Sequence, residues 1–138
     1  MAGLSFSTLK ARKQFLAVSA SGKSVATKSL VLQALPLSEN SPAPDTIQVG
    51  ITVSAKIGKA VIRNRVKRRL RVLIREIMLT HAAKNHWYVL IGRHAALDRP
   101  YISLQKDLRY ALHQLNIFVD HSKNSSSKRI NFNKSQIL

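Results

Sequence analysis

One stretch of the chain, residues 56–75, constrains the fold most because it combines dense positive charge with a regular apolar pattern. It reads KIGKAVIRNRVKRRLRVLIR and carries eight Lys or Arg residues between Lys59 and Arg75, with no acidic residue. Apolar residues recur at the spacing of one helix face, at Ile62, Val66, Leu70, Leu73 and Ile77. The pattern predicts a helix over about residues 59–80 that packs its apolar side on a sheet.

The other side of this predicted helix is basic. Its polar residues follow helical spacing too, at Asn64, Arg68, Arg71 and Arg75, with Lys67 beside them. Like charges four residues apart destabilise a helix by a few tenths of a kcal/mol per pair, so we expect packing to offset the repulsion and a polyanion to relieve it. The chain has 23 Lys and Arg residues against 6 Asp and Glu, a net charge of +17. A helix face that carries only positive charges, in a protein this basic, favours binding of a polyanion over exposure to solvent alone.

Strands are predicted on both sides of the basic helix. Residues 46–54 (TIQVGITVS) alternate apolar and polar side chains, residues 28–35 (KSLVLQAL) do so before them, and residues 86–92 (HWYVLIG) form a short apolar run. We expect the first two to be antiparallel. Because a strand, a long helix and a strand make a crossover unit, we expect 46–54 and 86–92 to be parallel neighbours.

Two further helices complete the predicted order. A short helix over about residues 10–19 begins after a cap at Ser7 or Thr8 and ends at Gly22. A last helix begins after Ser103 and presents an apolar stripe to the core, at Leu104, Leu108, Ala111, Leu112 and Leu115.

The length and the local composition predict one domain over residues 1–120. Residues 36–45 (PLSENSPAPD) are expected to form a loop, and the polar, basic residues 121–138 a disordered tail. The chain has no cysteine, which excludes disulfides and thiolate chemistry and fits a reducing compartment. No apolar run reaches the length of a membrane span. The basic opening is typical of a transit peptide or of a basic first helix; we favour the helix and expect a cytoplasmic protein.

The titratable residues do not suggest a protein active site. The six acids are scattered over different predicted elements, at Glu39, Asp45, Glu76, Asp98, Asp107 and Asp120. The five histidines show no paired ligand spacing, and no nucleophile lies beside an evident base. We therefore predict no catalytic residue and no metal ligand in the protein itself.

A second candidate surface is the face of the sheet that carries Val31, Gln33 and Thr52. If Phe15 of the first helix leans over this face, the two form a groove for an extended nucleic-acid strand, held by stacking and backbone contacts. The alternative is that Phe15 belongs to the core, and both readings stay open on the sequence.

Residues 50–75 closely resemble the signature of the protein subunit of bacterial ribonuclease P. In that family a strand ending in Ser-x-Lys is followed by Gly-x-Ala-Val-x-Arg-Asn-Arg-x-Lys-Arg and a further Arg. The matching positions are Ser54, Lys56, Gly58, Ala60, Val61, Arg63, Asn64, Arg65, Lys67, Arg68 and Arg71. The similarity extends over about residues 9–115, through Phe15, VLQAL, YVLIGR ending at Arg93, and the Leu-rich last helix.

The resemblance implies a small α+β protein, a two-layer α/β sandwich of order α-β-β-(β)-α-β-α. Its small mixed sheet is expected to contain an unusual left-handed β-α-β crossover. The resemblance also implies that the protein is monomeric within a complex with ribonuclease P RNA, and that the RNA performs the metal-dependent removal of the 5′ leader from precursor tRNA. Magnesium is then required by the RNA–protein complex and no cofactor is bound by the protein alone.

Two sets of site residues follow from the resemblance. The expected contacts to the catalytic RNA are Lys56, Lys59, Arg63, Asn64, Arg65, Lys67, Arg68, Arg71 and Arg75. The expected cleft for the 5′ leader is formed by Phe15, Lys28, Val31, Gln33 and Thr52. The chain departs from the family pattern at Ser19 and Gln33, where aromatic residues are common, so this cleft is less aromatic.

The sequence alone leaves alternative functions open. One is a structural RNA-binding protein of ribosomal type. Another is a helix-turn-helix DNA binder, although residues 54–58 follow a strand and not a first helix. A membrane-surface helix is disfavoured because its apolar side lacks Trp and Phe. We expect neither DNA nor a membrane as partner.

Overall fold

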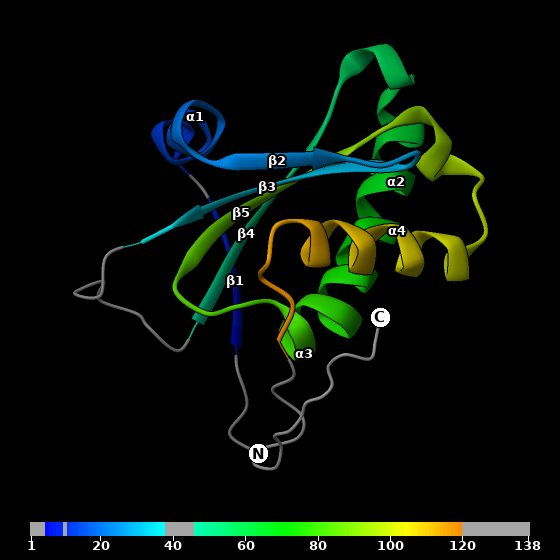
Figure 1. The fold of residues 1–138 in the computed structure, drawn as a ribbon. Helices are drawn as coiled ribbons and strands as arrows, with labels where there is room; N and C mark the ends of the chain where they lie inside the picture. Colours follow the sequence, from blue (N-terminus) through cyan, green and yellow to red (C-terminus); the bar gives the residue numbers. More distant parts are fainter. Residues whose placement is uncertain (1–4, 10, 38–45, 120–138) are drawn as a thin grey trace.

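The computed structural model describes residues 5–9, 11–37 and 46–119. Most of the predicted loop at 36–45 and all of the predicted tail at 121–138 lie outside these residues. The strands form one mixed five-stranded sheet of order β1-β4-β5-β3-β2 (Figure 1). Their bounds are Ser5–Thr8 for β1, Lys23–Ala26 for β2, Leu30–Pro36 for β3, Thr46–Val53 for β4 and His86–Gly92 for β5.

The helices confirm the predicted order of elements. They are α1 (Arg12–Ser21), α2 (Ala60–Leu73), α3 (Leu79–His81) and α4 (Tyr101–Gln114). Two 3-10 helices, η1 (Ala55–Ile57) and η3 (His94–Leu97), precede α2 and α4. The predicted helix over residues 59–80 is one continuous run in which a π-helical segment, η2 (Ile74–Met78), joins α2 to α3.

Strands β4 and β5 are parallel neighbours, paired from Gln48 with Trp87 to Val53 with Gly92. This confirms the crossover unit, because α2 lies between these strands in the chain. Strand β3 pairs antiparallel with β5. It therefore runs antiparallel to β4 as predicted, but β5 lies between the two.

One face of the sheet carries the main core. Helices α2 and α4 and the η2 segment cover it, and their buried side chains include Val66, Leu70, Ile77, Leu104 and Leu108. The apolar stripes predicted on both helices are thus the sides that pack. Tyr88 of β5 is fully buried among them, and its hydroxyl donates to the Ala83 carbonyl oxygen at 2.5 Å. Burial raises the pKa of this hydroxyl, which keeps the donor protonated.

The other face is covered only over one end, by α1 (Figure 1). A small cluster of Leu9, Val18 and Val89 is buried there, with Phe15 and Trp87 packed against it. The Trp87 indole N–H donates to Gln48 Oε1 at 2.6 Å, which satisfies its polar atom at this partly buried position.

Two local predictions were wrong. The N-cap position of the first helix is Ala11 and not Ser7 or Thr8, because the latter two lie in β1, which pairs parallel with β4. The last helix begins before Ser103, at Tyr101, with Pro100 in the N-cap position. Strand β1 was not predicted, and β2 fills the optional third strand of the predicted order at residues that no periodicity singled out. No helix among the described residues is both long and apolar enough to span a bilayer.

Candidate nucleic-acid interface

The approach to α2 is fixed by two residues of the Ser-x-Lys-x-Gly sequence. The Ser54 hydroxyl accepts the Lys56 backbone N–H at 3.1 Å and so caps η1, which leaves the Lys56 side chain exposed. Gly58 has φ 153°, a backbone conformation that residues with a side chain rarely adopt. A Cβ there would also lie 3.2 Å from Ile62. Glycine at this position therefore allows the chain to turn closely over the first turn of α2.

The cations of α2 are held on a helix whose underside is buried. Exposed side chains on its outer face are Lys59, Asn64, Arg65, Arg68, Arg71 and, at the start of η2, Arg75. Arg63 and Lys67 are half-buried, and Arg63 Nε donates to the Gly58 carbonyl oxygen at 3.1 Å. Because Val66, Leu70 and Leu73 anchor the helix in the core, these cations form a fixed surface, which we call the α2 ridge.

Arg69 lies on the same helix but does not belong to the α2 ridge. Its guanidinium donates to the carbonyl oxygens of Ala96, Leu97 and Arg99 at 2.8, 3.1 and 2.7 Å. The side chain therefore fastens the end of η3 to α2 and is half-buried. Arg69 is a structural residue, and it also lies outside the family motif matched by its neighbours.

The described acids do little to neutralise the α2 ridge. Within the described part of the chain, the ion pair is Arg99 with Asp107, Nε to Oδ2 at 2.8 Å. Glu76 accepts the Tyr101 hydroxyl at 2.5 Å; burial and this hydrogen bond raise the pKa of Tyr101 to about 12. A single-sign surface on a rigid helix is suited to bind phosphate groups, and guanidinium binds them bidentately.

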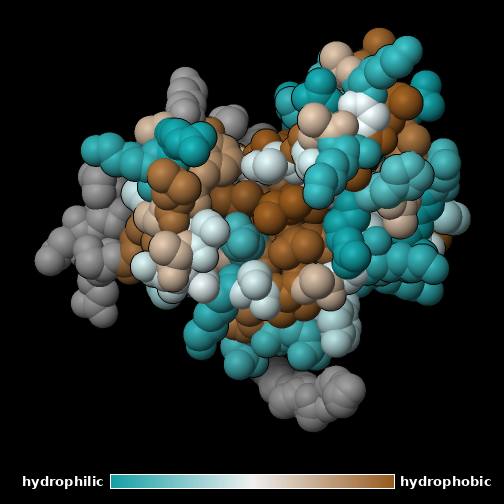
Figure 2. Space-filling model, turned by 90° about the horizontal axis from the view of Figure 1, so that it is seen from above, coloured by the Kyte–Doolittle hydropathy of each residue, from teal (hydrophilic) through white to brown (hydrophobic). Residues whose placement is uncertain are grey.

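Three of the expected cleft residues, Val31, Gln33 and Thr52, lie near one another on the face of the sheet that α1 only partly covers. In the register, Val31 pairs with Ile91 and Ile91 with Thr52, while Gln33 pairs with Val89 in the next row. Val31, Gln33 and Ile91 are half-buried and Thr52 is exposed. Figure 2 shows a hollow with an apolar floor between α1 and the segment that leads into α2.

Phe15 belongs to both the core and the cleft. Its ring packs against the small α1 cluster and covers Gly50, where a Cβ would lie 2.4 Å from Phe15 Cε1. Phe15 is half-buried and also lines a pocket of about 360 Å³. The other lining residues are Leu9, Val49, Ile51, Lys67, Arg71 and Arg75. The pocket thus brings an aromatic ring of α1 to the edge of the α2 ridge.

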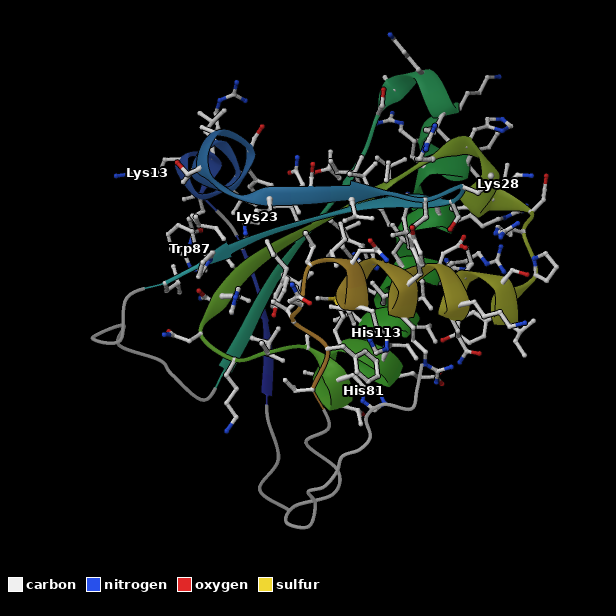
Figure 3. All side chains as sticks on the ribbon, in the orientation of Figure 1. Lys13, Lys23, Lys28, His81, Trp87 and His113 are labelled. Atoms are coloured by element: carbon white, nitrogen blue, oxygen red, sulfur yellow. The ribbon has the colours of Figure 1, made fainter. Side chains whose placement is uncertain are left out.

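Lys28 lies apart from this floor, in the turn between β2 and β3 (Figure 3). Arg93 is exposed beside it and donates from Nη1 to the Thr27 carbonyl oxygen at 2.7 Å. Sequence reasoning did not assign Arg93 or Ile91 to the site. The strand sequence YVLIGR could have indicated both residues. Its pairing with β4 places Ile91 opposite Thr52 and brings Arg93 to the same end of the sheet as Ser54.

Among the described residues, no group of three or more His, Asp or Glu side chains is close enough to hold a metal ion. What the geometry provides is a cationic ridge and a shallow, partly apolar cleft beside it. This fold and surface define a small basic α+β protein of the nucleic-acid-binding class.

Comparison with known proteins identifies the family. The Ribonuclease P family profile matches residues 5–116. The ribonuclease P protein component of Paramagnetospirillum magneticum is 44% identical over 104 residues, which cover 75% of this chain and 78% of that protein. That of Gluconacetobacter diazotrophicus is 38% identical over 109 residues, covering 79% of this chain and 90% of that protein.

Solved structures of this kind of protein share the fold. The RNase P protein of Staphylococcus aureus superposes with a TM-score of 0.66 and 27% identity, covering 80% of this chain and 96% of that one. The RNase P protein of Thermotoga maritima gives a TM-score of 0.61 and 25% identity, covering 78% and 94%.

The chain therefore belongs to the ribonuclease P protein family. As a protein component of this kind it is part of a ribonuclease complex that acts in tRNA processing, with ribonuclease P RNA as its partner. The individual site residues stay predictions from sequence and geometry.

Proposed function

We propose that the α2 ridge binds the catalytic RNA of ribonuclease P and that the cleft binds the 5′ leader of precursor tRNA. In this proposal the complex removes the leader by metal-dependent hydrolysis. The RNA carries out the chemistry and binds the magnesium ions, while the protein positions substrate and RNA. Family membership and the two adjacent surfaces support this assignment.

The observation that carries the proposal is the single-sign row of cations fixed on a buried helix. From Lys59 to Arg75 the row extends about 24 Å, at 1.5 Å per residue. A disordered basic segment loses conformational entropy when it binds, whereas these side chains start from a backbone already fixed by Val66, Leu70 and Leu73. The row can therefore follow an RNA backbone at little ordering cost.

The cleft supports leader binding through its shape and its chemistry. Its floor carries an apolar row, Val31 and Ile91, beside the hydroxyl of Thr52 and the amide of Gln33. Lys67, Arg71 and Arg75 line the neighbouring pocket with Phe15. An extended single strand can lay bases on the floor while its phosphates face these cations.

The structure disfavours a helix-turn-helix DNA binder. Helix α2 follows strand β4 and the short η1, and its apolar side packs on a sheet. A recognition helix instead follows a first helix across a tight turn.

Reconstitution tests the proposed function. Precursor tRNA is incubated with the protein alone, with cognate ribonuclease P RNA alone, and with both, over a magnesium titration. We expect no cleavage by the protein alone and a lower magnesium requirement with both components than with RNA alone. Efficient cleavage by the purified protein without RNA would refute the proposal.

A further inference from the structure

The outer face of α4 carries a second set of exposed residues that neither the α2 ridge nor the cleft uses. These residues are Ile102, Lys106, Arg109, Tyr110 and His113, which we call the α4 stripe. At 100° per residue they fall within about one third of the helix circumference, opposite the buried Leu104, Leu108 and Leu112. Ile102 is 62% exposed and Tyr110 is 54% exposed, so large apolar surface lies open among basic side chains.

No acid neutralises this stripe from its own helix. The one acidic residue of α4, Asp107, is only 13% exposed. Its carboxylate accepts the Ser29 hydroxyl at 2.6 Å and the Arg99 Nε–H at 2.8 Å, so its charge is already paired within the fold. The exposed charge of α4 is therefore of one sign, as on α2.

The α4 stripe is held rigidly relative to the α2 ridge. Near the start of α4, Arg69 binds the carbonyl oxygens that precede the helix, and the Tyr101 hydroxyl donates to Glu76. Near its end, the Phe118 ring stacks between His113 and His81, with ring centroids 4.0 and 4.5 Å away. Figure 3 shows the two histidines facing the same region from α4 and α3. The two basic surfaces thus lie on adjacent helices fixed at both ends.

We propose that the α4 stripe is a second RNA-binding surface that takes an unpaired segment of RNA. One base stacks on Tyr110, and the adjacent phosphates bind Lys106 and Arg109. A tyrosine ring flanked by cations is the combination that binds single-stranded RNA without sequence preference, and an unpaired base offers a free face for stacking. The inference rests on the proposed function, since it takes ribonuclease P RNA as the source of that segment.

A second copy of the chain fits this surface poorly. Each chain carries a net charge of +17, so two α4 stripes facing each other would bring cations together without acids. A polyanion relieves the same charge, and it already binds the neighbouring helix in the proposed function.

The test compares variants in binding to cognate ribonuclease P RNA across a KCl series. The first variant, Lys106→Gln/Arg109→Gln, removes two phosphate contacts. The second, Tyr110→Ala, removes the stacking platform, and Tyr110→Phe restores it. The matched control, Arg12→Gln/Lys13→Gln, removes the same charge from the exposed side of α1. A reference pair, Arg65→Gln/Arg68→Gln, reports on the α2 ridge.

We expect the Lys106/Arg109 pair to reduce the slope of log affinity against log salt by about 1.4, at about 0.7 per contact with a single strand. We expect Tyr110→Ala to weaken binding about tenfold with an unchanged slope, because stacking is not electrostatic. Tyr110→Phe and the α1 control are expected to bind like the wild type.

Wild-type binding by both α4 variants, with weakened binding by the Arg65/Arg68 pair, would overturn the inference and leave the proposed function intact. If the Arg65/Arg68 pair also bound like the wild type, both would fail. A photo-crosslinker placed at position 110 of the reconstituted complex gives a second readout. Crosslinks to RNA nucleotides support the inference, whereas crosslinks only to protein, or none, refute it.

Discussion

The two faces of the sheet differ in how completely helices cover them. On one face α2, η2 and α4 bury a continuous core that includes Leu32, Ile47 and Leu90. On the other face α1 covers a small buried cluster, Leu9, Val18 and Val89, and leaves the row of Val31, Ile91 and Thr52 open. The first face therefore supplies most of the stability, and the second remains available to a ligand.

Helix α2 links these two roles. Its underside belongs to the covered face, and its outer side presents cations that reach the edge of the open face at the pocket with Phe15. We therefore expect the same helix to be essential for folding at Leu70, which is buried, and dispensable for folding at Arg68, which is exposed. Substitutions on the two faces put this separation to the test.

The largest effect is expected from Leu70→Ala. Leu70 is fully buried against the sheet, so its truncation leaves a cavity and is expected to lower the free energy of unfolding by about 3 kcal/mol. Val31→Ala on the open face, where the side chain is half-buried, is expected to cost about 1 kcal/mol. Urea denaturation followed by circular dichroism measures both. Equal losses would contradict the difference between the two faces.

Gly50→Ala is expected to have the next largest effect, about 2 kcal/mol. The new methyl group would meet the Phe15 ring at 2.4 Å and Leu9 Cβ at 3.3 Å, so the ring has to move. In a Phe15→Ala background the same substitution is expected to be nearly neutral, because the main obstacle is absent. A double-mutant cycle by thermal denaturation gives this coupling. Additive losses would show that Phe15 is not what restricts position 50.

Arg69→Ala and Arg68→Ala sharpen the comparison on adjacent residues. Arg69 donates to the carbonyl oxygens of Ala96, Leu97 and Arg99, so its loss is expected to destabilise the fold by about 1.5 kcal/mol. Arg68 is exposed, and its loss is expected to leave the melting curve unchanged while weakening RNA binding. Melting curves measure the stability of the two variants, and RNA titrations measure their affinity for RNA. A stability loss in Arg68→Ala with a stable Arg69→Ala variant would contradict this assignment.

The long, periodic elements of this fold were predictable from the sequence. Alternation in residues 46–54 and the four-three stepping in α2 and α4 each reflect burial of one side, which is a local property of the chain. Strands β1 and β2 lack that signal, because SFST and KSVA are short and pair as outer strands whose position depends on the neighbour. The π-helical segment was missed because Leu73, Ile74 and Ile77 fit either helix type.

The candidate site was only partly predictable for a related reason. The motif identifies Arg63, Arg65 and Arg68, but only the packing of η3 on α2 shows that Arg69 turns inward. Likewise, the dual position of Phe15 follows from its contact with Gly50, which sequence spacing does not reveal. Tertiary contacts between distant segments decided both cases.

The central claim is that the exposed cations of α2 bind the catalytic RNA, and salt dependence tests it most directly. The affinity for cognate ribonuclease P RNA is measured across a KCl series for the wild type and for Arg65→Ala/Arg68→Ala/Arg71→Ala. A control, Arg12→Ala/Lys13→Ala/Lys23→Ala, removes the same charge elsewhere. At about 0.9 per contact, the α2 variant is predicted to lose about 2.7 from the salt slope while the control keeps it. An unchanged slope in the α2 variant, or an equal loss in the control, would contradict the claim.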